Sequence, residues 1–128
     1  MKTINTISYT GLGVLVFALV LPFSGCGKKE ADTYGQEIAN HTVTKIQEIL
    51  KKPGNFDNKT VTVQGKIIRE CPTGCWFEVK ENSGIIYVDL NPSGFAIPQK
   101  VGKTATVEGK VLVRNNQPMI AGTGVEIK

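Results

Sequence analysis

The sequence predicts a small all-β domain in which five short antiparallel strands curl into a barrel, with one short helix on its N-terminal side. The first observation is that apolar residues recur with a period of two over the second half of the chain, which is typical of half-buried strands. The second is a glycine in the middle of two of these segments, Gly65 and Gly109, where a strand can bend sharply. The third is that turn-forming clusters interrupt the pattern at short intervals, at residues 72–74, 82–84 and 115–117.

Length and composition exclude several classes of protein. The chain has 128 residues, a formal net charge of +4 and 41% hydrophobic residues. This apolar fraction is sufficient for a core and excludes a disordered polyion. The length allows one domain, and it excludes a multi-domain enzyme or a nucleotide enzyme built from repeated βαβ units of roughly 30 residues each. The positive charge is small and evenly spread, so by itself it indicates no polyanionic partner.

The first 25 residues have the pattern of a secretory signal. Residues 1–10 are polar and residues 11–23 are almost entirely apolar. As a helix, the apolar run would extend roughly 20 Å, less than the roughly 30 Å hydrocarbon core of a bilayer. It ends at Phe23-Ser24-Gly25-Cys26, which resembles a bacterial lipobox whose cysteine is lipidated and becomes the new N-terminus. We therefore assign residues 1–25 to a lipoprotein signal peptide and predict lipidation of Cys26.

The lipobox also predicts where the protein works. Three acyl chains, as the resemblance implies, would attach it firmly to a membrane, since each buried methylene contributes about 0.8 kcal/mol. The expected location is extracytoplasmic, on a bacterial membrane. Because Gly27 rather than Asp follows the cysteine, that membrane would be the outer one in a Gram-negative cell. The alternative is an ordinary signal peptide followed by an unmodified cysteine.

The mature chain is predicted to consist of a tether and one domain. Residues 26–43 are polar and are interpreted as a flexible tether, and residues 44–128 are assigned to the domain. A short helix is expected over residues 45–52, because Thr44 and Gln47 match a capping box and a Pro-Gly pair ends the apolar periodicity. A helix of this length is not stable alone and must pack on the barrel.

The strands follow with a distinctive internal repeat. Residues 59–67 and 103–111 match nearly residue for residue, and each copy carries one of the mid-strand glycines. A strand bent at such a glycine can serve two sheets, which favours a five-stranded OB-fold-like Greek-key barrel. A loop at residues 91–102 would replace the usual helix between strands three and four, and an SH3-type barrel is the rival. The strands are expected at residues 58–71, 75–81, 85–90, 104–114 and 118–127.

The turn between the first two strands carries both remaining cysteines. Cys71 and Cys75 flank Pro72-Thr73-Gly74, a sequence suited to a tight hairpin loop. Facing residues of an antiparallel pair lie within the Cα separation that a disulfide accepts. A structural Cys71–Cys75 disulfide is the favoured interpretation, since an oxidising compartment is expected. A redox-active pair, a soft-metal site and two reduced cysteines remain as alternatives, although no helix N-terminus is expected to stabilise a thiolate.

These residues also resemble a known group of proteins. The run Gly65-Lys66, then Cys71 and Gly74-Cys75-Trp76, then Tyr87-Val88-Asp89-Leu90, Gly94-Phe95 and Ile97-Pro98 is similar to bacterial secreted OB-fold proteins of unknown function. In those proteins a Cys-x(3–4)-Cys-Trp turn joins strands one and two. The resemblance implies the fold and the extracytoplasmic compartment, and it implies no reaction.

Strand alternation nominates a binding surface on the second and third strands. If Cys75, Phe77 and Val79 face the core, the residues between them face outward. The same reasoning on the third strand gives a candidate ligand-binding face with two aromatic rings and two carboxylates: Trp76, Glu78, Tyr87 and Asp89. The outer face of these strands commonly binds ligands in OB-folds. The alternative is that the helix or the 91–102 loop covers Trp76.

The predicted function is a lipid-anchored binding or accessory module of the cell envelope that recognises a protein or a small polar ligand. Carboxylates beside the aromatic rings argue against single-stranded nucleic acid, whose binders need a basic groove. No nucleophile, phosphate loop or closed metal-ligand set is found, and His41 is the sole histidine, so neither an enzymatic activity nor a cofactor or resident metal is predicted. The alternative function is a thiol-redox or copper-like soft-metal handling protein that uses Cys71 and Cys75.

Overall fold

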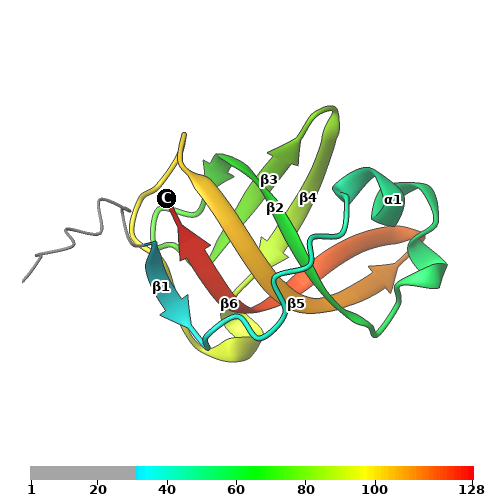
Figure 1. Cartoon of the computed structure of the whole chain (residues 1–128), viewed down its shortest axis with the longest axis horizontal. Coiled ribbons are helices and arrows are strands. Elements are labelled where there is room, and N and C mark those ends of the chain that lie inside the picture. Colours follow the sequence, from blue (N-terminus) through cyan, green and yellow to red (C-terminus); the bar gives the residue numbers. More distant parts are fainter. Residues whose placement is uncertain (1–30) are drawn as a thin grey trace, which may run out of the picture.

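The computed structural model describes residues 31–128, which form a β-barrel with one short helix (Figure 1). The predicted signal peptide and Cys26 lie outside the described residues. Within residues 31–128, no helix is long and apolar enough to cross a membrane. The elements are β1 (Asp32–Gly35), α1 (Ile46–Lys51), β2 (Thr60–Glu70), β3 (Trp76–Glu81), β4 (Gly84–Asp89), β5 (Thr104–Arg114) and β6 (Gln117–Ile127), with 3₁₀ turns η1 (Pro53–Asn55) and η2 (Asn91–Ser93).

Five of the strands close into the predicted OB-fold-like Greek-key barrel. The sheet order is β1-β6-β4-β3-β2-β5, and an additional pairing between β6 and β5 closes the ring. All pairings between these strands are antiparallel except β4 with β6. The predicted strands agree with the observed ones to within two residues at each end, because their turn residues and their period of two are both strong local signals.

The two mid-strand glycines lie where neighbouring strands approach closely. β2 pairs with β5 up to Lys66 and with β3 from Lys66 onward. A Cβ on Gly65 would lie 2.5 Å from the carbonyl oxygen of Lys80, so a side chain there would separate β2 from β3. A Cβ on Gly109 would overlap the backbone of Ala121, next to a register shift in the β5–β6 pairing. The glycines therefore permit the sharp coiling that one strand needs to serve two partners.

The helix closes one end of the barrel, but its predicted cap does not form. Ile46 and Ile49 are fully buried. The backbone N–H of Ile46 donates to the Glu81 carboxylate, and the Gln47 amide donates to the hydroxyl of Ser83. No side chain among the described residues caps the helix from within its own turn, and Lys45 rather than Thr44 occupies the N-cap position. The β3–β4 hairpin supplies the partners instead, because the helix packs directly on Gly84.

The structure differs from the predicted tether over residues 32–43. β1 pairs antiparallel with the end of β6, from Asp32 opposite Ile127 to Gly35 opposite Gly124. Ile38 is 3% exposed, and the backbone carbonyl of Asn40 accepts from the hydroxyl of Thr62. This segment is polar, yet it forms ordered structure because the end of β6 has unpaired backbone groups that β1 satisfies. β1 lies at the end of the barrel away from α1 (Figure 1).

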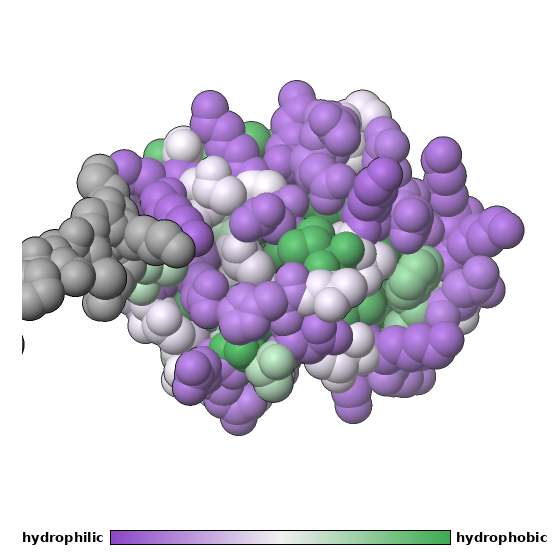
Figure 2. All heavy atoms as spheres, viewed as in Figure 1, coloured by the Kyte–Doolittle hydropathy of each residue, from purple (hydrophilic) through white to green (hydrophobic). Residues whose placement is uncertain are grey.

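The surface is mostly hydrophilic. The side shown in Figure 2 is covered largely by hydrophilic residues, and apolar residues form only small, separate areas between them. The exposed large apolar side chains of the described chain are Val43, Leu50, Ile85 and Val101. Scattered residues of this kind are ordinary, so a binding surface has to be identified from geometry rather than from hydropathy alone.

Candidate functional site: a cysteine turn beside an aromatic face

The β2–β3 turn brings the two cysteines together. The N–H of Cys71 donates to the carbonyl of Trp76, and the N–H of Gly74 donates to the carbonyl of Cys71, which closes a tight turn. The two Sγ atoms lie 2.6 Å apart, and both residues are half-buried thiols in this structure. Cys75, expected among the core-facing residues, is therefore partly accessible. The thiols could be oxidised to a disulfide with little backbone movement.

The turn is held in place by the segment that follows β4. Gly74 has a φ of +73°, and a Cβ there would overlap the backbone of Ile97. The N–H of Ile97 donates to the carbonyl of Gly74, and the Gln99 amide donates to the carbonyl of Pro72 at 2.9 Å. The Glu70 carboxylate accepts from two backbone N–H groups of the same segment through Oε1, at residues 100 and 101. The 91–102 segment is therefore the support of the cysteine turn.

The turn favours the thiolate of Cys71. Hydrogen bonds lower the pKa of Cys71 to about 6, mainly from the Cys75 thiol and then from the Thr73 hydroxyl, whose Oγ1 lies 3.1 Å from the Cys71 sulfur. The backbone N–H groups of Cys75 and Thr73 contribute further. From the sequence, with no helix N-terminus at the turn, no such stabilisation is expected. The structure supplies it from a hydroxyl and from turn amides, which the sequence alone does not orient.

The four predicted face residues share the outer surface of β3 and β4. Trp76 lies opposite Asp89, and Glu78 lies opposite Tyr87 in the β3–β4 register. The rings of Trp76 and Tyr87 stack diagonally, with centroids 5.4 Å apart and planes inclined by 29°. All four side chains are half-buried. Neither the helix nor the 91–102 loop therefore covers Trp76 completely, contrary to the alternative prediction.

A fifth residue, Arg69, completes this face and was missed from the sequence. Its guanidinium carbon lies 5.8 Å from the centroid of the Trp76 ring, and its Nη1 lies 3.7 Å from Oε2 of Glu78. Strict alternation from the buried Ile67 would turn Arg69 inward. The β2–β3 register shifts between Ile67 and Arg69, and this bulge turns Arg69 outward. A bulge without a glycine leaves no clear sequence signal.

A groove adjoins the aromatic pair. It has a volume of about 340 Å³ and lies between the face, the helix and the β5–β6 turn. The pKa of the Tyr87 hydroxyl is raised mainly by partial burial and then by nearby ionisable groups, of which Asp89 has the largest effect. The groove is lined by Leu50, Glu78, Ile85, Tyr87, Asn116, Gln117 and Pro118.

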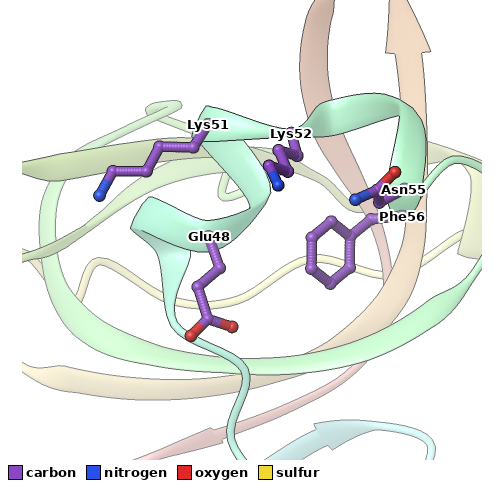
Figure 3. A pocket seen from close by; sticks show the side chains of 5 residues that line it. All are labelled: Glu48, Lys51, Lys52, Asn55 and Phe56. Atoms are coloured by element: carbon purple, nitrogen blue, oxygen red, sulfur yellow. The ribbon is translucent and has the colours of Figure 1, made fainter.

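A second hollow of about 310 Å³ lies over the helix and η1 (Figure 3). The Glu48 carboxylate and the Phe56 ring project to the same side of the helix, and Lys51 extends away from them. Lys52 and Asn55 complete the lining. This hollow contains one carboxylate and two lysines, and it includes none of the residues of the predicted face.

The metal alternative has no third ligand in the structure. Within residues 31–128, no group of three or more His, Cys, Asp and Glu side chains is placed to hold a metal ion. The Nε2 of His41 lies 3.3 Å from Oε1 of Glu126, which is on β6 and not part of the cysteine turn. A metal bound here would rely on Cys71 and Cys75 alone among these residue types.

Comparison with known proteins supports the barrel fold. The chain is similar to the hypothetical protein YgiW of E. coli, with a TM-score of 0.50 and 22% identity over 68% of this chain and 90% of that one. It is also similar to a proposed aspartyl-tRNA synthetase of Leishmania major Friedlin, with a TM-score of 0.53 and 12% identity, covering 73% of this chain and 22% of that one. No family model and no curated protein matches the chain. At these identities the likeness establishes the fold alone.

Proposed function

We propose that the protein is a non-enzymatic binding module whose ligand, a protein or a small polar molecule, contacts the outer face of β3 and β4. The observation that carries this proposal is the stacked pair of Trp76 and Tyr87, which stays half-exposed beside a groove. Aromatic rings at the surface bind partners well because they offer a large rigid area and lose little entropy. The carboxylates of Glu78 and Asp89 on this face oppose the binding of nucleic acid.

The proposed place of action is the cell envelope, through a lipid on Cys26. The support is the apolar leader and the lipobox-like residues before Cys26. From Cys26 to Asp32 the chain can extend at most about 20 Å. A lipid there would hold β1 close to the membrane, and with it the 91–102 segment, since the Lys100 ammonium lies 3.6 Å from the Asp32 carboxylate. The cysteine turn, which packs on that segment, would also lie toward the membrane.

The proposed role of the cysteine turn is to fix the edge of the binding face. Oxidation of Cys71 and Cys75 to a disulfide would hold the ends of β2 and β3 together, directly before Trp76. The loop closed is about five residues, which gives roughly 2 kcal/mol of stabilisation in the chain-entropy model. The resemblance to secreted OB-fold proteins with a Cys-turn-Cys-Trp element is consistent with this role.

Photo-crosslinking from two matched positions tests the binding face. A benzophenone amino acid replaces either Ile85, at the groove, or Val43, which forms a parallel bridge with Thr62 of β2; both residues are 43% exposed. After irradiation in living cells, we expect a discrete adduct from position 85 and much less from position 43. Equal labelling from both positions, or none from position 85, would count against the proposed face.

A second candidate function is thiol redox or soft-metal handling by the cysteine turn. Two observations favour it: the sulfurs are in contact, and hydrogen bonds lower the pKa of Cys71 to about 6. A thiolate is the form that attacks disulfides and binds soft metals. A thiol count on the folded protein, with and without reductant, separates the candidates. Two free thiols that protect one equivalent of Cu(I) support metal handling, whereas an inert disulfide supports the structural role.

A further inference from the structure

We propose that the Trp76/Tyr87 face recognises a basic side chain of a protein partner, best an arginine, which lies along the groove and places its guanidinium between the aromatic pair and Glu78. This inference rests on the proposed binding function and adds the chemical class of the ligand. It is carried by three features of the described residues: an internal cation already held on the face, a groove of amphipathic lining, and a carboxylate shared by the groove and the face.

The internal cation is Arg69. Its guanidinium lies over the Trp76 ring, 5.8 Å from the centroid, and its Nη1 lies 3.7 Å from the Glu78 carboxylate. A cation over an aromatic face with a carboxylate at its edge is the arrangement that recognises guanidinium and ammonium groups. The Arg69 side chain is 68% exposed, whereas that of Glu78 is 22% exposed. The contacts of Arg69 therefore indicate that this face can bind a guanidinium group. Because an exposed ion pair contributes little free energy, a cation of the ligand could replace Arg69 at small cost.

The groove fits the rest of a basic side chain. Leu50, Ile85 and Pro118 give it apolar walls, and Ile85 is 43% exposed. Glu78 and Tyr87 line both the groove and the aromatic face, so the two join at these residues. An arginine or lysine has an apolar stem and a charged head, and it commonly lays the stem on apolar surface while the head meets a carboxylate.

The charges around the groove suit a cation. Glu78 is the charged residue of its lining, whereas Asp89, opposite Trp76 on β4, already accepts through Oδ1 from the backbone N–H and the side-chain amide of Asn91. Two cations face the same surface: Arg69 on β2, and Lys80, the next outward residue on β3, opposite Ile85. Displacement of Arg69 leaves the carboxylate of Glu78 for the ligand.

The emission of the sole tryptophan, Trp76, reports this binding directly. The full-length protein in detergent is titrated with the blocked pentapeptide Gly-Gly-Arg-Gly-Gly and with the same peptide carrying citrulline, a neutral isostere of arginine. We expect a saturable change in emission with the arginine peptide, and affinity about tenfold weaker with citrulline because the charge-assisted hydrogen bond to Glu78 is lost. A third peptide with Glu in place of Arg should produce no saturation.

Three variants test the residues that carry the inference. Glu78→Gln should weaken binding of the arginine peptide about tenfold, whereas Glu37→Gln, the same change at an exposed carboxylate between β1 and α1, should leave it unchanged. Arg69→Ala should tighten binding several-fold, since it removes the internal competitor. A Tyr87→Ala variant should lose the response.

The outcomes separate this inference from the proposed function. Equal affinity for the arginine and citrulline peptides, no saturation with arginine, or an unaffected Glu78→Gln variant overturns the assignment of a basic ligand. If position 85 still yields a discrete crosslinked adduct in cells, the face binds a ligand of another class and the proposed function stands. If that adduct is also absent, both are wrong.

Discussion

The inner and outer faces of β3 and β4 carry residues that differ in burial and in role. Toward the core, Phe77, Val79, Ile86 and Val88 are 0–1% exposed. Toward the outside, the alternating positions carry the half-buried aromatic pair and two carboxylates. Hydrophobic burial fixes the inner residues, since the barrel cannot close without them. The barrel does not need large aromatic rings on its outer surface for stability. The identity of the outward residues can therefore reflect the binding of a ligand.

The largest expected effect is the difference in unfolding free energy lost when a residue of the inner or of the outer face is replaced by alanine. Phe77→Ala removes the largest fully buried side chain and should lower the free energy of unfolding by about 3–5 kcal/mol. Trp76→Ala, one residue away on the outer face, should cost about 1 kcal/mol, because Trp76 is only half-buried. Chemical denaturation measures both values. Equal losses would show that the outer face is part of the core and would remove the contrast on which the binding proposal depends.

The next effect tests the support of the cysteine turn. Gly74→Ala should destabilise the protein by about 2–3 kcal/mol, because it combines a positive φ with a clash against Ile97. Gly94→Ala is the matched control: its φ is +71°, but nothing lies within 4 Å of the added Cβ, so about 1 kcal/mol is expected. Thermal or denaturant unfolding of the two variants gives the comparison. A loss at Gly74 no larger than that at Gly94 would mean that the close packing of the turn on Ile97 contributes little to stability.

A third effect concerns the proposed disulfide. Oxidised protein should be more stable than reduced protein by about 2 kcal/mol, as expected for a loop of about five residues. The double variant Cys71→Ser/Cys75→Ser should show no dependence on reductant. Denaturant unfolding with and without reductant measures the difference, and mass spectrometry verifies the oxidation state. A stable fold that never forms the bond under oxidising conditions would favour the thiol-redox or soft-metal candidate.

The smallest effect on the fold, and a clear one on reactivity, concerns Cys71. Because its pKa is lowered to about 6, the reduced protein should alkylate rapidly at pH 7, and the rate should fall as the pH drops through about 6 and the thiolate is protonated. An unperturbed thiol would lose reactivity at a much higher pH. Thr73→Ala removes a hydroxyl that donates to the thiolate, so its midpoint should be higher. The pH dependence of iodoacetamide labelling measures this; a midpoint near that of an ordinary thiol contradicts the hydrogen-bonding account.

Local patterns predicted the barrel well, and long-range pairings explain what they missed. Alternation and turn residues located the strands, the cysteine turn and the four outward residues, since each of these depends on neighbours in sequence. β1 was assigned to a tether because its stability comes from pairing with β6, about ninety residues later. The capping box failed for a similar reason: the Glu81 carboxylate reaches the first helical N–H and no local cap is needed.

The site was less predictable than the fold because its details depend on small irregularities. One register shift beyond Ile67 turned Arg69 outward, where it meets Trp76 and Glu78. The orientation of the Thr73 hydroxyl, and hence the lowered pKa of Cys71, depends on how the turn packs on the 91–102 segment. Sequence patterns record neither a bulge without glycine nor the direction of a hydroxyl group.

Ligand binding by the outer face of β3 and β4 can be tested through the crosslinked adduct from position 85 in a Trp76→Ala/Tyr87→Ala background. Circular dichroism and denaturant unfolding first establish that the barrel is intact. Our expectation is that the yield of this adduct falls at least about tenfold, as for the loss of central aromatic anchors. An adduct of undiminished yield in a folded double variant would contradict it.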